Sequence, residues 1–217
     1  LAGRVFGGWP RGEDPFRRAP VPAVPPLRES RGIIVEEDVN AVTVQIQWHG
    51  PSASKDEAAT FAADVYSDVL NQPTSRFHQR LVESGLWQGI VVNYYTLNHV
   101  GPITVSGQTT PERLREALVA LHAELRATLE PGYFRDEELE DMKAHRAVTT
   151  AFGQERATEN SHTIGFWWSV IGLDYHFRYI DEMAKQTAAD LQRYARTYIV
   201  GKPRVTGVML PHGTRER

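Results

Sequence analysis

The residues from Ala41 to Trp48 alternate between apolar and polar side chains, which is the pattern of a β-strand with one buried and one solvated face. From Val42 onward every second residue is large and apolar, and the residues between them are Thr or Gln. Helices can cover only one face of a sheet built from such strands, because burying the other face would cost its polar side chains their hydrogen bonds to water. The chain is therefore expected to adopt an α+β fold with helices packed on one face.

The remaining elements follow from the same kinds of pattern. The strands 88–97 and 102–108 are close enough in sequence to form a hairpin. Because helices and strands do not alternate regularly, the sheet is predicted to be mainly antiparallel. Helix N-caps are predicted at Thr110, Asp174 and Thr187. The predicted strands are 33–36, 41–48, 88–97, 102–108 and 205–210, and the predicted helices are 55–70, 75–83, 111–129, 136–150, 157–172, 175–185 and 188–198.

Six prolines lie between Trp9 and Arg28, in a stretch with neither a helical nor an alternating pattern. Since proline fixes φ and lacks an amide donor, this stretch is expected to run extended as a linker. We divide the chain into three parts. Residues 1–30 are the expected end of a preceding domain plus a proline-rich linker, residues 31–212 form the folded domain, and residues 213–217 form a tail. The start at Leu1 favours a fragment of a longer protein.

Composition excludes several classes of function. The 24 Lys and Arg residues are interspersed with 27 Asp and Glu, for a net charge of −3, so no basic field for nucleic acid exists. No apolar run approaches the roughly 20 residues of a membrane span. The chain has no cysteine, which excludes disulfides, thiolate zinc sites and a cysteine nucleophile but leaves the compartment open.

The titratable side chains form no complete catalytic or metal-binding motif. No two of the eight histidines are four residues apart, so neither His-Glu-x-x-His nor His-x-x-Glu-His occurs. The acidic run from Asp136 to Asp141 suits the positive end of a helix dipole. Ser161 and His162 are adjacent and would point about 100° apart on a helix. We predict no catalytic residue and no metal ligand in this chain.

Two aromatic pairs, Tyr94 with Tyr95 and Trp167 with Trp168, could stack on a ligand or belong to the core. Adjacent strand residues face opposite ways, so one tyrosine of the first pair is expected on the sheet face away from the helices. That face also carries the Thr and Gln residues of the first alternating strand. It is open to a partner or to the wall of a chamber, and plain solvent exposure is the alternative.

Seven short segments stand out by their order and spacing along the chain, and they are 6–12, 45–51, 75–77, 81–86, 172–175, 188–192 and 207–211. Together they resemble the C-terminal domain, also called the inactive domain, of insulinase/pitrilysin-type zinc peptidases, the inverzincin family. The likeness covers nearly the whole chain. Each segment alone is only a loose match, and the order and spacing make the resemblance specific.

The resemblance implies that two similar α+β halves enclose a peptide-binding chamber. In that family the His-x-x-Glu-His zinc motif lies on the first long helix of the N-terminal half. The counterpart helix here, 55–70, contains no histidine. The resemblance therefore implies a half without a cofactor of its own, and zinc is expected in a companion catalytic domain.

Active members of the family use an Arg and, seven residues later, a Tyr of this half to hold substrate near the metal. Here Arg80 is followed seven residues later by Trp87, and an alignment on Gly85-Leu86 places Gln88 at the Tyr position instead. The Tyr is missing in both alignments. The candidate substrate-binding residues are Arg80, Trp87, Tyr94 and Tyr95.

The favoured interpretation is a non-catalytic half that walls the chamber of a zinc metallopeptidase. Its partners would be a catalytic peptidase domain, in the same chain or in another subunit, and a peptide substrate. A structural or assembly subunit derived from the same fold is the alternative, and an unrelated enzyme that uses the scattered histidines is a third. By resemblance to exported bacterial relatives, a periplasmic location is suspected.

Overall fold

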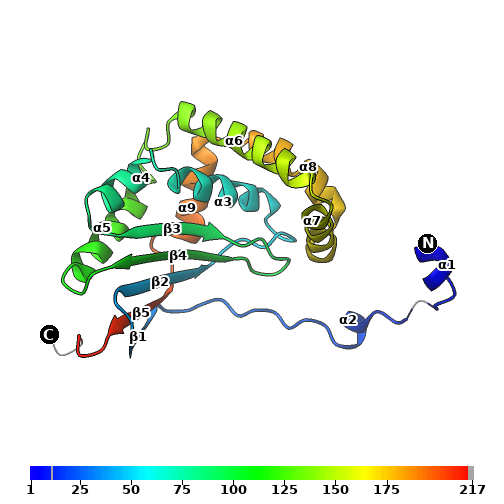
Figure 1. The fold of residues 1–217 in the computed structure, drawn as a ribbon, viewed down its shortest axis with the longest axis horizontal. Coiled ribbons are helices and arrows are strands. Elements are labelled where there is room, and N and C mark those ends of the chain that lie inside the picture. The colour runs from blue at the N-terminus through cyan, green and yellow to red at the C-terminus, as the bar shows by residue number, and fades with distance from the viewer. Residues whose placement is uncertain (11, 215–217) are drawn as a thin grey trace.

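A computed structural model describes residues 1–10 and 12–214. Five strands form one sheet in the order β1-β5-β2-β4-β3, with helices above one face of it (Figure 1). All neighbouring strands are antiparallel except β1 and β5, which are parallel. The predicted α+β fold with a mainly antiparallel sheet is therefore confirmed. The strands are β1 (Arg31–Glu37), β2 (Val42–His49), β3 (Gly89–Tyr94), β4 (Pro102–Thr109) and β5 (Val205–Pro211).

The helices of the domain form a layer on the apolar side of the sheet. α3 lies next to β3, and α6, α8 and α9 pack around α3 (Figure 1). The predicted second helix is split, because a single α-turn leads directly into a π-helical turn, η1. The helices are α3 (Glu57–Leu70), α4 (Arg76–His78), η1 (Gln79–Glu83), α5 (Leu114–Ala127), α6 (Asp136–Gln154), α7 (Ala157–Val170), α8 (Leu173–Ala184) and α9 (Ala188–Tyr198).

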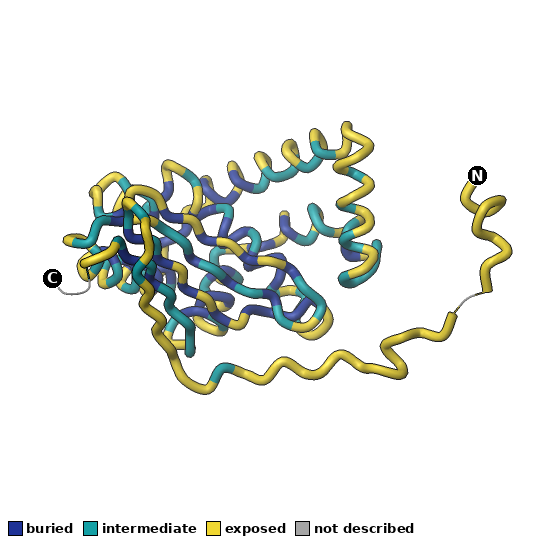
Figure 2. Tube along the Cα trace, turned by 60° about the horizontal axis from the view of Figure 1, so that its bottom comes forward, coloured by how far each residue is buried: buried dark blue, intermediate teal, exposed yellow. Residues whose placement is uncertain are grey.

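The core lies between the sheet and the helix layer, where Figure 2 shows the buried residues gathered. The apolar side chains that alternate along β2 are all buried there. α3 contributes Phe61, Val65, Tyr66 and Val69 to the same buried core. The alternation in the sequence therefore identifies the covered face correctly, because burial of these side chains is what holds the two layers together.

The predicted caps have different outcomes. Thr187 caps α9 as expected, since its side chain and that of Asp190 form a capping box. Thr110 does not cap α5, because a turn closed by the Arg113 N–H and the Thr110 carbonyl precedes the helix, which begins at Leu114. Asp174 lies inside the first turn of α8, and the cap is Gly172, whose φ of 111° favours glycine.

The N-terminal segment runs away from the domain and is exposed almost throughout (Figures 1 and 2). The expectation of a wholly extended linker is wrong at one turn, because α2 (Pro15–Arg18) forms within it. The Asp14 carboxylate accepts a hydrogen bond from the Phe16 N–H, and Pro15 occupies the first helical position, where proline is favoured. A second short helix, α1 (Ala2–Phe6), precedes it. Of the expected tail, residues 215–217 lie outside the described residues.

Gly107 of β4 provides a test of how tightly the sheet meets the helix layer. A Cβ atom there would lie 2.6 Å from the Trp87 ring and 2.9 Å from the Gly89 carbonyl oxygen. Gly107→Ala should therefore lower the free energy of unfolding by about 1–3 kcal/mol, measured by urea denaturation. Gly207→Ala in β5 is the control, because its nearest contact would be an ordinary 3.8 Å to the Gln45 carbonyl oxygen. Equal stability of the two variants would contradict the packing described.

Candidate functional site

α3 corresponds to the helix on which the resemblance would place zinc ligands, and here it presents two carboxylates four residues apart. The Tyr179 hydroxyl donates to Asp64 at 2.7 Å. The Arg146 guanidinium donates to Asp68 through Nε at 2.8 Å and pairs with it through Nη2 at 2.7 Å. No group of three His, Cys, Asp or Glu side chains suited to a metal ion occurs among the residues that the structure describes. The side chains of the described residues therefore offer no donor set that fits zinc.

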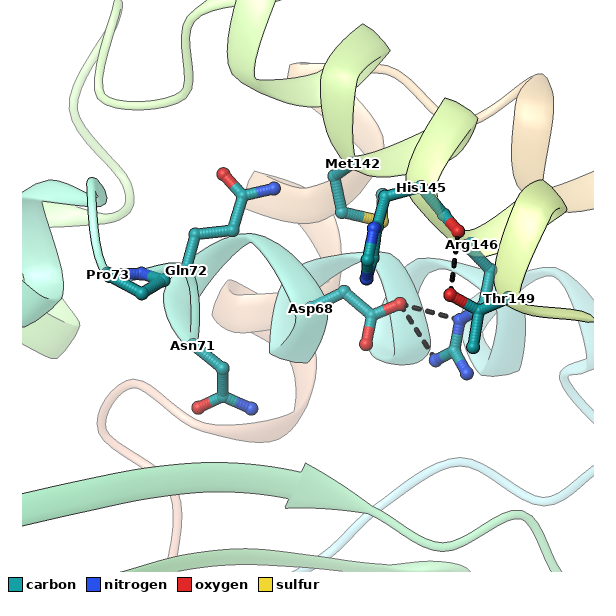
Figure 3. Close-up of a pocket in the computed structure, with 8 residues that line it drawn as sticks. All are labelled: Asp68, Asn71, Gln72, Pro73, Met142, His145, Arg146 and Thr149. Carbon is teal, nitrogen blue, oxygen red and sulfur yellow. Dashed lines mark hydrogen bonds and ion pairs between the residues drawn. The ribbon is translucent and has the colours of Figure 1, made fainter.

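The ion pair of Asp68 and Arg146 borders a cavity of about 300 Å³ between α3 and α6 (Figure 3). Met142 and His145 of α6 and Gln72 beyond the end of α3 also line it. Arg146 of α6 thus joins the two helices through its ion pair with Asp68 of α3. The cavity contains one histidine and no nucleophile paired with a base, so it offers no catalytic arrangement.

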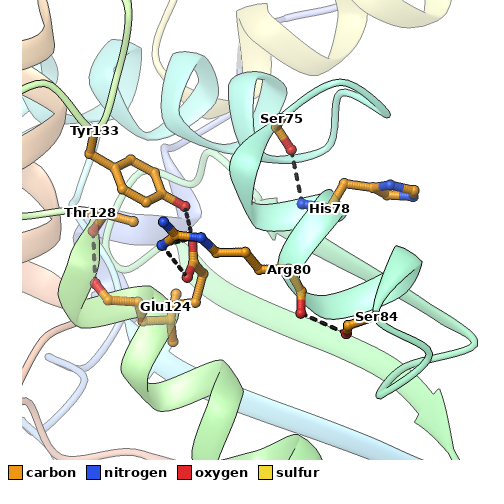
Figure 4. Close-up of polar contacts among 8 residues, drawn as sticks. Ser75, His78, Arg80, Ser84, Glu124, Thr128 and Tyr133 are labelled. Atoms are coloured by element: carbon orange, nitrogen blue, oxygen red, sulfur yellow. Dashed lines mark hydrogen bonds and ion pairs between the residues drawn. The ribbon is translucent and has the colours of Figure 1, made fainter.

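Arg80 extends from η1 and is held by a buried carboxylate (Figure 4). Its Nη1 atom lies 3.1 Å from Glu124 Oε2, and the Tyr133 hydroxyl donates to Glu124 Oε1 at 2.6 Å. The Glu124 side chain is 6% exposed, whereas that of Arg80 is 56% exposed. Arg80 therefore neutralises a charge in the core, and the outer part of its guanidinium remains accessible to a ligand.

The other three candidate residues differ in exposure. Trp87 is buried and its indole N–H donates to the Ala117 carbonyl at 3.2 Å. Tyr94 is also buried, and its hydroxyl donates to the Pro51 carbonyl at 3.0 Å. Tyr95, just after β3, is 49% exposed, and its ring centroid lies 5.7 Å from that of Phe166 in α7. Of these three, only Tyr95 offers a surface that a peptide could contact directly.

The sheet face away from the helices, here called the open face, carries almost no charge. The pairing register shows which strand residues lie on this face, and nearly all of them have uncharged side chains. The exceptions are Arg31 and Glu37 at the two ends of β1 and His49 at the end of β2. Such a face can be covered by another layer without the desolvation cost of buried charge. Its central residues are Thr43, Gln45 and Gln47 of β2, Thr104, Ser106 and Gln108 of β4, Val91 and Asn93 of β3, and Val205 and Met209 of β5.

One end of the open face is hollowed beside β3. The cavity measures about 540 Å³ and lies between the open-face residues Ser106 and Gln108 and the η1 segment that precedes β3. His78 and Val82 line its other side. The hollow therefore brings the segment that carries Arg80 next to the open face, which the sequence alone did not indicate.

Sequence reasoning missed the partners of the candidate residues. Glu124 lies 44 residues from Arg80, and no local pattern connects them. One signal was available, since Glu124 falls on the apolar stripe of α5 between Leu121 and Leu125, where a lone acid needs a buried partner. Asp64, which lies between the buried residues Ala63 and Val65 of α3, gave the same kind of signal.

The five-stranded sheet and its helix layer define an α+β domain in which the described residues hold no group of metal ligands. The sequence model described as the Peptidase M16 inactive domain matches residues 1–145, and the chain belongs to this family. No curated protein sequence matches it. No helix of the described residues is long and apolar enough to cross a membrane.

Solved structures share the fold at low sequence identity. A protease from Helicobacter pylori superimposes with a TM-score of 0.76 at 18% identity, covering 88% of this chain and 47% of that one. The inactive peptidase domain of a protein described as a zinc protease from Bordetella parapertussis gives 0.70 at 20% identity, covering 82% and 94%. The periplasmic protease PqqL from Escherichia coli gives 0.65 at 14%, covering 84% and 21%. The chain thus spans less than half of the H. pylori protein.

The carboxyl group of Asp64 predicts a pH dependence of stability. Burial raises its pKa to about 7, against the lowering effect of the Tyr179 hydrogen bond. Between about pH 4 and 7 the native state keeps a proton that the unfolded state has lost, so the free energy of unfolding falls as pH rises, by about 1.4 kcal/mol per unit from this group. Asp64→Asn should remove that slope in urea denaturation at pH 4.5 to 6.5.

Asp181→Asn, at an exposed position on α8, is the control and should keep the native slope. An unchanged slope in Asp64→Asn would contradict the protonation state assigned to this carboxyl group.

Proposed function

We propose that this chain is the non-catalytic half of a zinc metallopeptidase and that its open face forms part of the wall of a peptide-binding chamber. The observation that carries the proposal is the uncharged open face of a domain in this family. Threonine, serine and amide side chains can hydrogen-bond to the backbone of any peptide, so such a wall would tolerate varied sequences. The partner that closes the chamber is a catalytic domain, in the same polypeptide or in another subunit.

The chemistry would be divided between the two halves. Zinc, held by a His-x-x-Glu-His motif in the companion, would supply a bound water of lowered pKa for peptide hydrolysis. This half would position the peptide, with Arg80 and Tyr95 as contacts and with Trp87 and Tyr94 supporting the strand and loop from the core. We also propose that the protein is exported, and this location is supported by the periplasmic protease of Escherichia coli that shares the fold.

A structural or assembly subunit is the second candidate function. The Tyr expected seven residues after Arg80 is absent, and the Arg80 guanidinium is already engaged by Glu124. The two candidates differ in what accompanies the chain. A His-x-x-Glu-His motif in the preceding couple of hundred residues or in a copurifying subunit favours the peptidase, whereas its absence from both favours the assembly subunit.

Charge placed on the open face should disrupt the chamber. Gln45 and Ser106 are register partners at the centre of this face, and the double substitution Gln45→Glu with Ser106→Glu leaves the core untouched. In the protein with its catalytic companion, we expect peptide turnover to fall at least about tenfold, because closing the chamber would desolvate two carboxylates. A fluorogenic peptide assay measures the loss.

The matched control is Gln154→Glu at the end of α6, away from the sheet, which should retain native turnover. Native turnover of the open-face variant would contradict the role proposed for this face.

Arg80→Ala should reduce peptide turnover severalfold in the same assay, because it removes the exposed part of the guanidinium that a peptide could contact. It also deprives the buried Glu124 of an ion-pair partner, so stability needs a control. Tyr133→Phe removes the other hydrogen bond to Glu124 and leaves Arg80 in place. Loss of turnover in Arg80→Ala alone supports a peptide contact, whereas equal loss in both variants assigns Arg80 to structure only.

A further inference from the structure

A small cavity of about 140 Å³ lies on the helix side of the sheet, at the end of β2. α5 and the segment between α9 and β5 enclose it. Leu125 and the residues from Ile199 to Gly201 form its uncharged walls, and no carboxylate lines it. The polar part of the lining consists of four nitrogen-bearing side chains, which are Trp48, His122, Arg126 and Arg204.

Two of these side chains have buried donors without a partner. The Trp48 side chain belongs to a residue only 3% exposed, and its Nε1–H makes no hydrogen bond within residues 1–10 and 12–214. Arg204 Nε is likewise buried and unpartnered. Buried donors are nearly always satisfied in native proteins, so a bound ligand or a water molecule is expected to accept these hydrogen bonds.

Charge around the cavity is positive and uncompensated. Neither Arg126 nor Arg204 forms an ion pair with a carboxylate in the described part of the chain. His122 Nε2 lies 3.2 Å from Arg204 Nη2. Burial and the nearby Arg204 and Arg126 lower the pKa of His122 to about 4, so the neutral imidazole can accept a hydrogen bond from Arg204.

We propose that this cavity is a binding site for a small oxyanion, with Trp48 Nε1, Arg204 Nε and the Arg126 guanidinium as its donors. Guanidinium and indole N–H groups suit phosphate, sulfate and carboxylate oxygens, whereas a cation would be repelled by both arginines. Trp48 Nε1 and Arg204 Nε are buried, which limits screening by water and strengthens the hydrogen bonds that they can donate. The site is on the opposite side of the sheet from the open face and does not depend on the proposed peptidase role.

The position of Arg204 suggests what the ligand would do. Its backbone N–H donates to the Ser30 hydroxyl at 3.2 Å, and its carbonyl accepts from the Arg31 N–H at 2.9 Å. These two bonds fix the point at which the linker becomes β1. An anion that immobilises Arg204 would therefore stiffen the junction between this domain and the segment that precedes it.

Nuclear magnetic resonance of the ¹⁵N-labelled chain, with inorganic phosphate as the probe, tests the site directly. Sodium phosphate is titrated against sodium chloride at constant ionic strength, and Trp48→Phe identifies the indole resonance by its disappearance. We expect a saturable shift of the Trp48 Nε1–H signal with phosphate and none with chloride. Parallel titrations with sulfate and with a short peptide bearing a free or an amidated C-terminus distinguish an inorganic anion from a peptide carboxylate as the source.

Arg126→Gln and Arg204→Gln should each weaken the phosphate response at least about tenfold, whereas Arg115→Gln, at an exposed position of the same helix as Arg126, should leave it unchanged. Arg126 is exposed, so its variant remains informative if the Arg204 variant does not fold. Absence of a saturable Trp48 shift with every anion, or an equal response in the Arg126 and Arg115 variants, would overturn the proposal and assign the unpartnered donors to water.

Discussion

The packing of α3 between the sheet and the surrounding helices is the constraint on which the rest of the structure depends. Nine of its fourteen residues are buried, so the helix has little surface left for chemistry. Two of its three carboxylates, Asp64 and Asp68, are held by Tyr179 and Arg146, which tie α8 and α6 to it. The third, Glu57 at the start of the helix, pairs with Arg178 of α8. The helix that would bear zinc ligands in a catalytic half is therefore committed here to holding the helix layer together.

The same packing leaves the other side of the sheet open. The near absence of charge on that open face is the feature of the fold that supports the proposed function. A face meant to remain in water gains solubility from charged side chains, and this one carries amides, hydroxyls and a few aliphatic groups instead. The charged groups of the described domain lie mostly on the helices, in loops and near strand ends. This division is what a wall that must repeatedly meet peptide or a partner layer requires, because uncharged polar groups are cheaper to desolvate.

Patterns local in sequence predicted most of the fold, and contacts distant in sequence account for what they missed. Alternation along β2 identified the covered face, and the Thr187 cap needed only its own neighbours. The start of α5 was misplaced because the turn at Thr110 competes with the cap that Thr110 and Pro111 would otherwise form. For the site, the burial of Trp87 and the pairing of Arg80 with Glu124 depend on α5, which no spacing near η1 reveals.

Metal analysis combined with an activity assay distinguishes a domain that assists a zinc peptidase from one that binds zinc itself. The 217-residue chain and its companion domain would be purified separately, measured for zinc, and assayed for peptide cleavage apart and mixed. We expect zinc only in the companion and cleavage that rises when this chain is added. Stoichiometric zinc in this chain, or a companion whose cleavage is unaffected by it, would contradict the proposed function.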